Sequence, residues 1–137
     1  MSALTNRATG GTLLALAGLH VAWGCGSAFP FKSRQDLAEA VIGGQEVPPP
    51  TACFAVAAAL LLGGVLVHDV PHTPDALRRT GLLAMAGVFG TRAALGWAGK
   101  TDLVSPGSNS ARFRRLDKRM YSPLCAALAA GSASARS

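Results

Sequence analysis

Several residues with ionisable or reactive side chains stand inside or beside long apolar segments of this 137-residue chain, among them His20, Arg92, Asp117, Tyr121 and Cys125. Histidine can relay a proton or bind a metal or haem, and arginine can hold an anion. Tyrosine and cysteine can act as reactive partners of a nearby base. Because ionisable groups are costly in apolar surroundings, they usually face a partner or a cavity.

Arg92 lies within the apolar stretch 81–98. A buried guanidinium needs a carboxylate or several carbonyl groups as partners. We predict that Asp117 is this partner, with Asp102 as the second choice. The favoured interpretation is a pair that fastens the third apolar segment to the fourth, or an arginine that extends to a membrane surface. The other interpretation is an arginine that binds a ligand.

His20 and Trp23 are three residues apart, so they share one face of a helix. We favour a histidine that is hydrogen-bonded to a neighbouring helix over a proton relay or a metal or haem ligand. A two-histidine haem site is disfavoured, because His68 and His72 fall on the opposite side of the predicted bundle. Trp23 and Trp97 are expected at one membrane interface, where tryptophan is enriched.

The three cysteines, Cys25, Cys53 and Cys125, show no spacing typical of a zinc site or a disulfide framework. A buried cysteine usually behaves as a small apolar residue. The chain also contains no phosphate-binding loop, nucleotide-binding fingerprint or zinc-protease motif. We therefore predict no metal, no cofactor and no catalytic residue.

Composition points to a membrane. Half of the residues are hydrophobic, only 15% are charged, and the formal net charge is +6. Disordered chains are poorer in apolar residues, and soluble domains carry about a quarter charged residues. Basic side chains gather between the apolar segments without interleaved aromatic residues. We interpret this charge as the flanking charge of a membrane protein and expect no nucleic-acid partner.

Four apolar segments predict an all-α integral membrane bundle of four transmembrane helices in a single domain, the fourth helix being short and marginal. Small residues, especially glycine, are expected at the contacts. The alternatives are a cleaved signal peptide at the first segment and a soluble helical bundle. The predicted helices are 10–31, 51–68, 81–98 and 121–135, joined by a loop 32–50 with an interfacial helix near residues 35–42 and a basic loop 99–120.

Short connections between antiparallel helices place loops 32–50 and 99–120 on the same face of the bundle. These loops carry more Lys and Arg than the other face, so we expect them in the cytoplasm and both termini outside, in a multi-pass protein of the cell membrane. The polar residues of the apolar segments then collect on the loop side, in a cluster of His20, Trp23, Arg92, Asp117 and Tyr121.

The stretch 113–125, which reads FRRLDKRMYSPLC, resembles a family of small bacterial membrane proteins that carry domain of unknown function 3995. The stretch 19–24, the prolines at 48–50 and Arg92 extend the resemblance over about residues 12–128. It implies four transmembrane helices and marks the five clustered residues as motif positions, without assigning a reaction. Family members usually carry a longer, leucine-rich last helix, whereas here that helix ends in Gly-Ser-Ala-Ser-Ala.

We therefore expect a small, non-enzymatic membrane protein that binds a lipid or another amphiphile, or that acts as an accessory subunit. Its expected partners are membrane lipids, a membrane protein or a second copy of the chain. The alternative is a membrane-embedded enzyme or redox protein that uses His20 with Tyr121 or Cys125.

Overall fold

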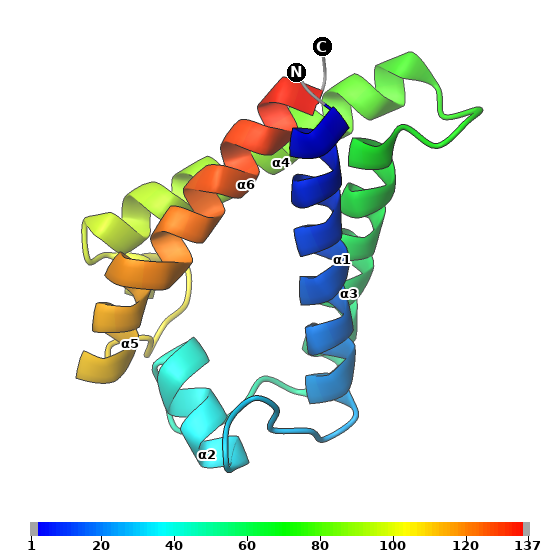
Figure 1. The fold of residues 1–137 in the computed structure, drawn as a ribbon. Helices are drawn as coiled ribbons and strands as arrows, with labels where there is room; N and C mark the ends of the chain where they lie inside the picture. Colours follow the sequence, from blue (N-terminus) through cyan, green and yellow to red (C-terminus); the bar gives the residue numbers. More distant parts are fainter. Residues whose placement is uncertain (1–2, 136–137) are drawn as a thin grey trace.

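The structure is a computed structural model that describes residues 3–135, and all regular structure within that range is helical (Figure 1). The predicted all-α class is confirmed. Four long helices form the frame of the molecule: α1 (Ala3–Gly24), α3 (Pro50–His68), α4 (Asp75–Trp97) and α6 (Ser122–Ala135). The connections contain α2 (Arg34–Leu37), the 3₁₀ turn η2 (Thr101–Leu103), α5 (Ala111–Leu116) and two π-helical segments, η1 (Ala38–Ile42) and η3 (Asp117–Tyr121).

The long helices are arranged as two pairs. Helix α1 packs along α3, and α4 packs along α6. The pairs meet near the two ends of the chain and diverge toward the end that carries α2 and α5 (Figure 1). At the junction, a buried core draws Leu13, Val67, Leu82 and Leu128 from all four helices. The fold is therefore an arch, with its apex at the termini.

A second set of contacts closes the open end of the arch, where the two connections predicted to share a face lie against each other. Tyr121 donates a hydrogen bond from its hydroxyl to the carbonyl of Ala40 at 2.7 Å, and Ser110 donates from Oγ to the carbonyl of Glu39 at 3.1 Å. The carbonyl of Gly43 accepts from the backbone N–H groups of residues 109 and 110. We call these contacts the clasp.

Helix boundaries differ from the hydropathy segments at the polar ends. Helix α1 begins at Ala3 and ends at Gly24, whereas the apolar segment covers 10–31. Its end is stabilised by Arg34, which donates to the carbonyl of Trp23 in the last turn and to that of Ser27 just beyond it, at 3.0 and 2.8 Å. Helix α4 begins at Asp75 and includes a charged first turn that hydropathy leaves out.

The second half of the predicted basic loop is helical. Residues 111–135 form one uninterrupted helical run through α5, η3 and α6. Its π turn lies just before Pro123, which has no N–H and whose ring would clash with the carbonyl four residues back in a regular α-helix. The N–H of Ser122 instead donates to the carbonyl of Asp117, five residues back.

Each π turn frees backbone carbonyls for contacts between elements. In η3, the carbonyl of Lys118 accepts the indole N–H of Trp97 at 3.3 Å. In η1, the N–H of Gly43 donates to the carbonyl of Ala38, five residues back. This leaves the carbonyls of Glu39 and Ala40 available to the clasp.

Among the helices of residues 3–135, α3 alone combines the length and hydropathy of a membrane-crossing segment. Helix α4 carries Asp75, Arg78 and Arg79 near its start and Arg92 in its second half, and α6 has 14 residues.

Candidate functional site

The predicted pairing of Arg92 with Asp117 is present. Arg92 Nη1 lies 2.8 Å from Asp117 Oδ1, and the Asp117 side chain is only 3% exposed. Helix α4 contributes the arginine and the π segment η3 contributes the aspartate, so the pair fastens one helix of this side of the arch to the other. Asp102, the second choice, is exposed and forms no ion pair within the described part of the chain.

Two hydroxyl groups complete the surroundings of Asp117. Thr101 Oγ1 donates to Asp117 Oδ2 at 2.5 Å, and Ser122 Oγ donates to Asp117 Oδ1 at 3.2 Å. Both hydroxyl-bearing residues are buried. A buried carboxylate that lacks such donors is strongly destabilising, so this set of three donors explains how the charge is kept inside the fold. We call Arg92, Thr101, Asp117 and Ser122 the polar node.

Sequence reasoning missed two members of the polar node. Nothing in the sequence singles out Thr101, and the pattern around Ser122 predicts a cap at the start of the last helix. No such start exists, because the helix runs on from residue 111. The available signal was Pro123: a proline inside a helical pattern indicates an irregular turn just before it, and that turn brings Ser122 back toward Asp117.

Gly96 makes the polar node possible. A Cβ atom at this position would overlap the Ser122 hydroxyl and would lie 2.7 Å from Asp117 Oδ1 and 2.9 Å from Arg92 Nη1. Only glycine leaves room for these polar groups against the backbone of α4.

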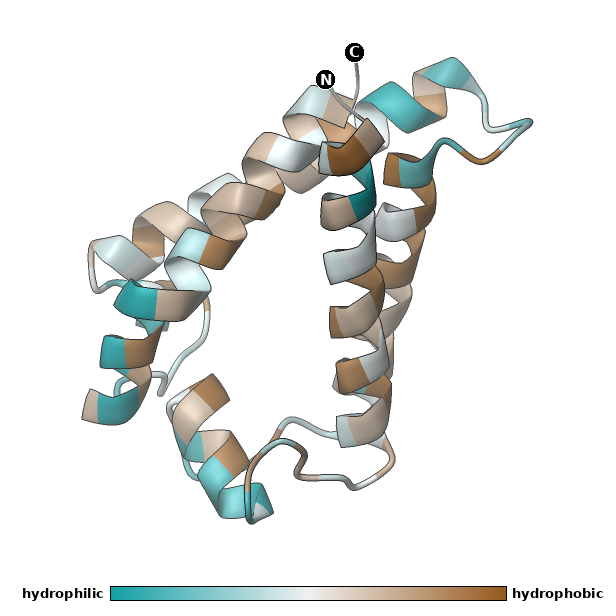
Figure 2. Ribbon diagram, viewed as in Figure 1, coloured by the Kyte–Doolittle hydropathy of each residue, from teal (hydrophilic) through white to brown (hydrophobic). Residues whose placement is uncertain are grey.

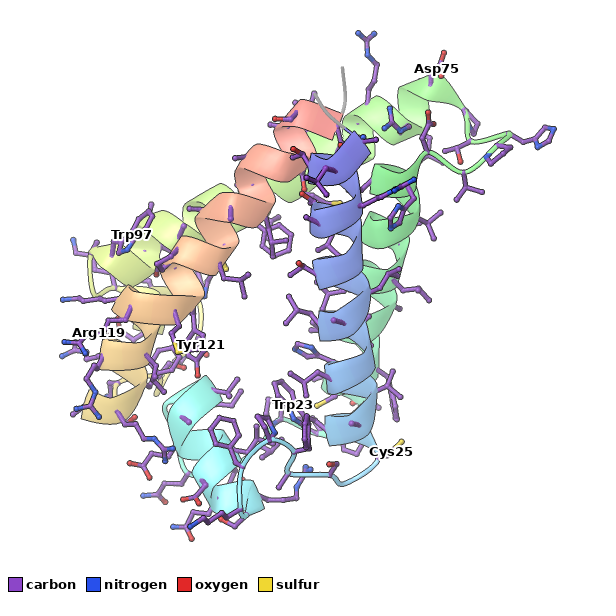
Figure 3. The ribbon with its side chains drawn as sticks, viewed as in Figure 1. Trp23, Cys25, Asp75, Trp97, Arg119 and Tyr121 are labelled. Atoms are coloured by element: carbon purple, nitrogen blue, oxygen red, sulfur yellow. The ribbon has the colours of Figure 1, made fainter. Side chains whose placement is uncertain are left out.

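His20 and Trp23 occupy the other helix pair. Their ring centroids are 4.7 Å apart, in agreement with the shared helical face. Trp23 is buried with Leu37 and Cys53, and its indole N–H donates to the carbonyl of Phe29 at 2.8 Å. It is therefore a core residue, while Trp97 is half exposed. In Figure 3, Trp23 and Tyr121 lie on different sides of the arch.

The five residues predicted as one cluster thus fall into two groups. Arg92 and Asp117 lie in the polar node, and Tyr121 lies beside them in the clasp. Within residues 3–135, no hydrogen bond, ion pair or ring contact joins His20 to Tyr121 or to Cys125. The pairings required by the enzymatic alternative are therefore not formed.

A groove of about 610 Å³ runs along α4 beside the polar node. Its lining is apolar apart from Thr91 and one charged residue, Arg92; the other residues are Ala84, Gly87, Val88, Phe89, Leu95, Val104 and Cys125. The only protein acceptors of Arg92 in the described chain are Asp117 and Thr101, and both are reached by Nη1. The guanidinium therefore keeps donors for a group in the groove.

A smaller cavity of about 160 Å³ lies on the opposite helix pair, and His20 and Trp23 contribute to its wall. It shares no lining residue with the groove. Within the described residues no group of three or more His, Cys, Asp or Glu side chains could hold a metal ion, and the three cysteines are unpaired thiols.

Comparisons with known proteins identify a family. A search of curated proteins and a search of solved structures found no match. A family model described as a protein of unknown function (DUF3995) matches residues 13–132, which is nearly the whole chain. The match includes the polar node, the clasp, the groove and the cavity beside His20. This chain is a member of the DUF3995 family.

Proposed function

We propose that this protein is a multi-pass membrane protein that holds an anionic lipid in the groove along α4. The observation that carries the proposal is the composition of that groove: an almost wholly apolar wall in which Arg92 is the one charged residue. An acyl chain would lie against the apolar wall, and the headgroup would meet Arg92.

The surface of α3 supports placement in a bilayer. Its most apolar 18-residue window is only 33% buried, although the helix is apolar on all sides. Such a helix belongs either in a protein core or in lipid, and this one is not enclosed by protein. Large apolar side chains stand exposed on it, including Phe54, Leu61 and Leu62.

The distribution of polar residues along the arch supports the same placement. Hydrophilic residues gather on α2, on α5 and at the start of α4, whereas the middle of the long helices is hydrophobic (Figure 2). Helices α1 and α4 contain 22 and 23 residues. At 1.5 Å per residue each is roughly 33 Å long, which matches the hydrocarbon thickness of a bilayer of about 30 Å. In the proposal α1, α3, α4 and α6 all cross, and the clasp end faces the cytoplasm.

The size of the groove and its one charged residue support the proposal of a lipid site. Its volume lies within the range of roughly 300–1,000 Å³ typical of small-molecule sites. Arginine forms two parallel hydrogen bonds with carboxylate or phosphate oxygens, which gives it selectivity for an anionic headgroup. Asp117 accepts a hydrogen bond from Nη1 and thereby fixes the orientation of the guanidinium beside the groove.

Filling the groove tests the proposal. Gly87 lines the groove, and a Cβ at this position meets no atom within 4 Å. Gly87→Phe should therefore fold and occupy the space of the acyl chain. The matched control is Gly18→Phe on α1, because Gly18 is equally open and lies outside the groove.

The measurement is native mass spectrometry of delipidated protein after addition of phosphatidylglycerol or phosphatidylcholine with identical chains. We expect wild type and Gly18→Phe to retain phosphatidylglycerol preferentially, and Gly87→Phe to lose it. Arg92→Lys should keep binding but weaken the preference, because lysine cannot form the paired hydrogen bonds. Equal retention of phosphatidylglycerol by Gly87→Phe and wild type would overturn the proposal.

A further inference from the structure

The cavity beside His20 is a separate site with different chemistry. Helix α1 supplies His20 and Trp23, the α2–η1 segment supplies Leu37, Val41 and Ile42, and residues around the start of α3 complete the wall. Charged residues are absent from this lining. It lies on the opposite helix pair from the groove, so its role is independent of lipid binding there.

One hydrogen bond of His20 determines which of its ring nitrogens is left as an acceptor. Its Nδ1 lies 2.7 Å from the carbonyl oxygen of Leu16. A carbonyl only accepts, so Nδ1 carries a proton, and in the neutral ring Nε2 is left as an acceptor. No hydrogen-bond partner of Nε2 occurs among the described residues.

The remaining side chains of the cavity add little polarity. The indole N–H of Trp23 is already used by the carbonyl of Phe29, so Trp23 offers only its apolar ring. The thiol of Cys53 is directed to the carbonyl of Pro48 at 3.8 Å. His20 is therefore the only lining side chain that presents a nitrogen or oxygen acceptor to an occupant.

The volume of the cavity indicates the size of molecule that it can hold. Its volume is about 160 Å³, and an apolar cavity of roughly 150 Å³ engineered in another protein stays dry and takes up benzene. We propose that this cavity binds a neutral six-membered aromatic ring that carries one hydroxyl group, that is, a phenol ring. The hydroxyl would donate to His20 Nε2, and the ring would pack on Trp23 and the surrounding aliphatic side chains.

The test compares two probes of nearly equal size, 4-fluorophenol and fluorobenzene, which differ by the hydroxyl donor. Binding to the purified full chain in detergent micelles is followed by ¹⁹F NMR, and partition into protein-free micelles is subtracted. We expect saturable binding of both probes, with 4-fluorophenol bound about threefold to tenfold more tightly, as one net hydrogen bond provides.

Two variants separate the hydrogen bond from the space. His20→Leu removes the acceptor and should abolish the preference for 4-fluorophenol while fluorobenzene still binds. Ala52→Leu fills the cavity and should abolish binding of both probes. Its matched control, Ala58→Leu, lies on the exposed face of the same helix and should bind like wild type.

Equal affinity of the two probes for wild type would overturn the assignment of a hydroxylated ring. Unchanged binding of both probes to Ala52→Leu would overturn the site itself. If His20→Leu fails to fold, the comparison of the two probes on wild type still tests the hydrogen bond. If Ala52→Leu fails to fold, a lack of saturable fluorobenzene binding by wild type still overturns the site. None of these outcomes alters the lipid test, since Gly87 lies in the other helix pair.

Discussion

Helices α1 and α3 approach each other through glycines such as Gly24 and Gly64, which face the apolar side chains of Phe54 and Leu14. Helices α4 and α6 are instead fastened by a buried ion pair with two further hydroxyl donors. In the first pair, Gly64 lies against the end of the Leu14 side chain. In the second pair, Gly96 lies against the polar node. Apolar contacts permit small shifts, but a buried carboxylate is satisfied only when every donor is in place. We infer that the second pair sets a unique helix register and the first follows the shape of its neighbours.

Asp117→Ala is expected to have the largest effect on stability, because it removes the buried ion pair that distinguishes the second helix pair from the first. The change leaves the Arg92 guanidinium partly buried without its carboxylate and removes the acceptor of Thr101 and Ser122. Loss of one partner of a buried ion pair costs about 3–5 kcal/mol. We expect the free energy of unfolding, measured by circular dichroism during denaturant titration in detergent, to fall by that amount.

Asp102→Ala is the control for this experiment, because Asp102 is exposed and carries the same charge. Its effect should stay within about 0.5 kcal/mol. A similar loss in both variants would show that net charge, and not the polar node, determines the stability of the second pair.

Adding one methyl group to each helix pair sharpens the comparison. In Gly96→Ala, the new Cβ meets the fixed polar groups of Ser122 and Asp117, and overpacking of this kind costs about 1–3 kcal/mol. In Gly64→Ala, the new Cβ lies 2.8 Å from Leu14 Cδ2, which can move. The gain in helix propensity, about 1 kcal/mol, should offset most of that contact.

Thermal and denaturant unfolding of the two variants should therefore rank Gly96→Ala well below Gly64→Ala. A third variant, Gly90→Ala, meets only Ala129 at the ordinary distance of 3.9 Å and checks that α4 tolerates alanine. If Gly64→Ala were the more destabilised variant, the contrast between the pairs would be reversed.

A smaller effect is expected in the clasp. Tyr121→Phe deletes the hydrogen bond to the carbonyl of Ala40 without changing the ring that packs near Phe113, with centroids 6.0 Å apart. The loss should be about 1 kcal/mol. Amide hydrogen exchange should increase in residues 38–43 and remain unchanged in the polar node. Equal acceleration in both places would mean that clasp and polar node open as one unit.

The smallest effect is predicted for the ion pair between Asp36 and Arg112. The two charged groups are 3.9 Å apart, and both side chains are more than one third exposed. Water and salt screen such a pair, which contributes about 0–1 kcal/mol. Asp36→Asn should lower the free energy of unfolding by less than Tyr121→Phe does, and added salt should leave the difference between wild type and variant near zero. A loss as large as that of Asp117→Ala would contradict the assignment of this pair to the solvated surface.

The sequence predicts a contact best where one residue is costly to bury without a particular partner. An arginine in an apolar segment demands a carboxylate, and this requirement is enough to predict Asp117 as its partner. The helical spacing of His20 and Trp23 likewise predicts their contact. Hydropathy locates the long helices but misplaces the start of α1 and α4, because polar residues such as Arg7 and Asp75 continue a helix beyond its apolar part.

The distance between the two helix pairs could not be predicted from the sequence. Topology places His20 and Arg92 at the same depth, but depth leaves open how far apart two helix pairs lie. The clasp could not be predicted either. It uses backbone carbonyls that become available only when a π turn replaces hydrogen bonds four residues apart with one five residues apart. Tyr121 could be recognised as a motif residue, yet its acceptor, the carbonyl of Ala40, carries no side-chain signal at all.

The π turn at η3 adds one residue to the helical run, and this extra residue sets the rotation of α5 relative to α6. Each residue advances a helix by about 100°. Deleting one residue from 117–121 would remove the extra residue of the π turn and would rotate α5 by that angle relative to α6. Phe113, which now packs against Gly43, would turn away from the other connection. The length of this short stretch therefore decides whether Phe113 can reach Gly43 on the other side of the arch.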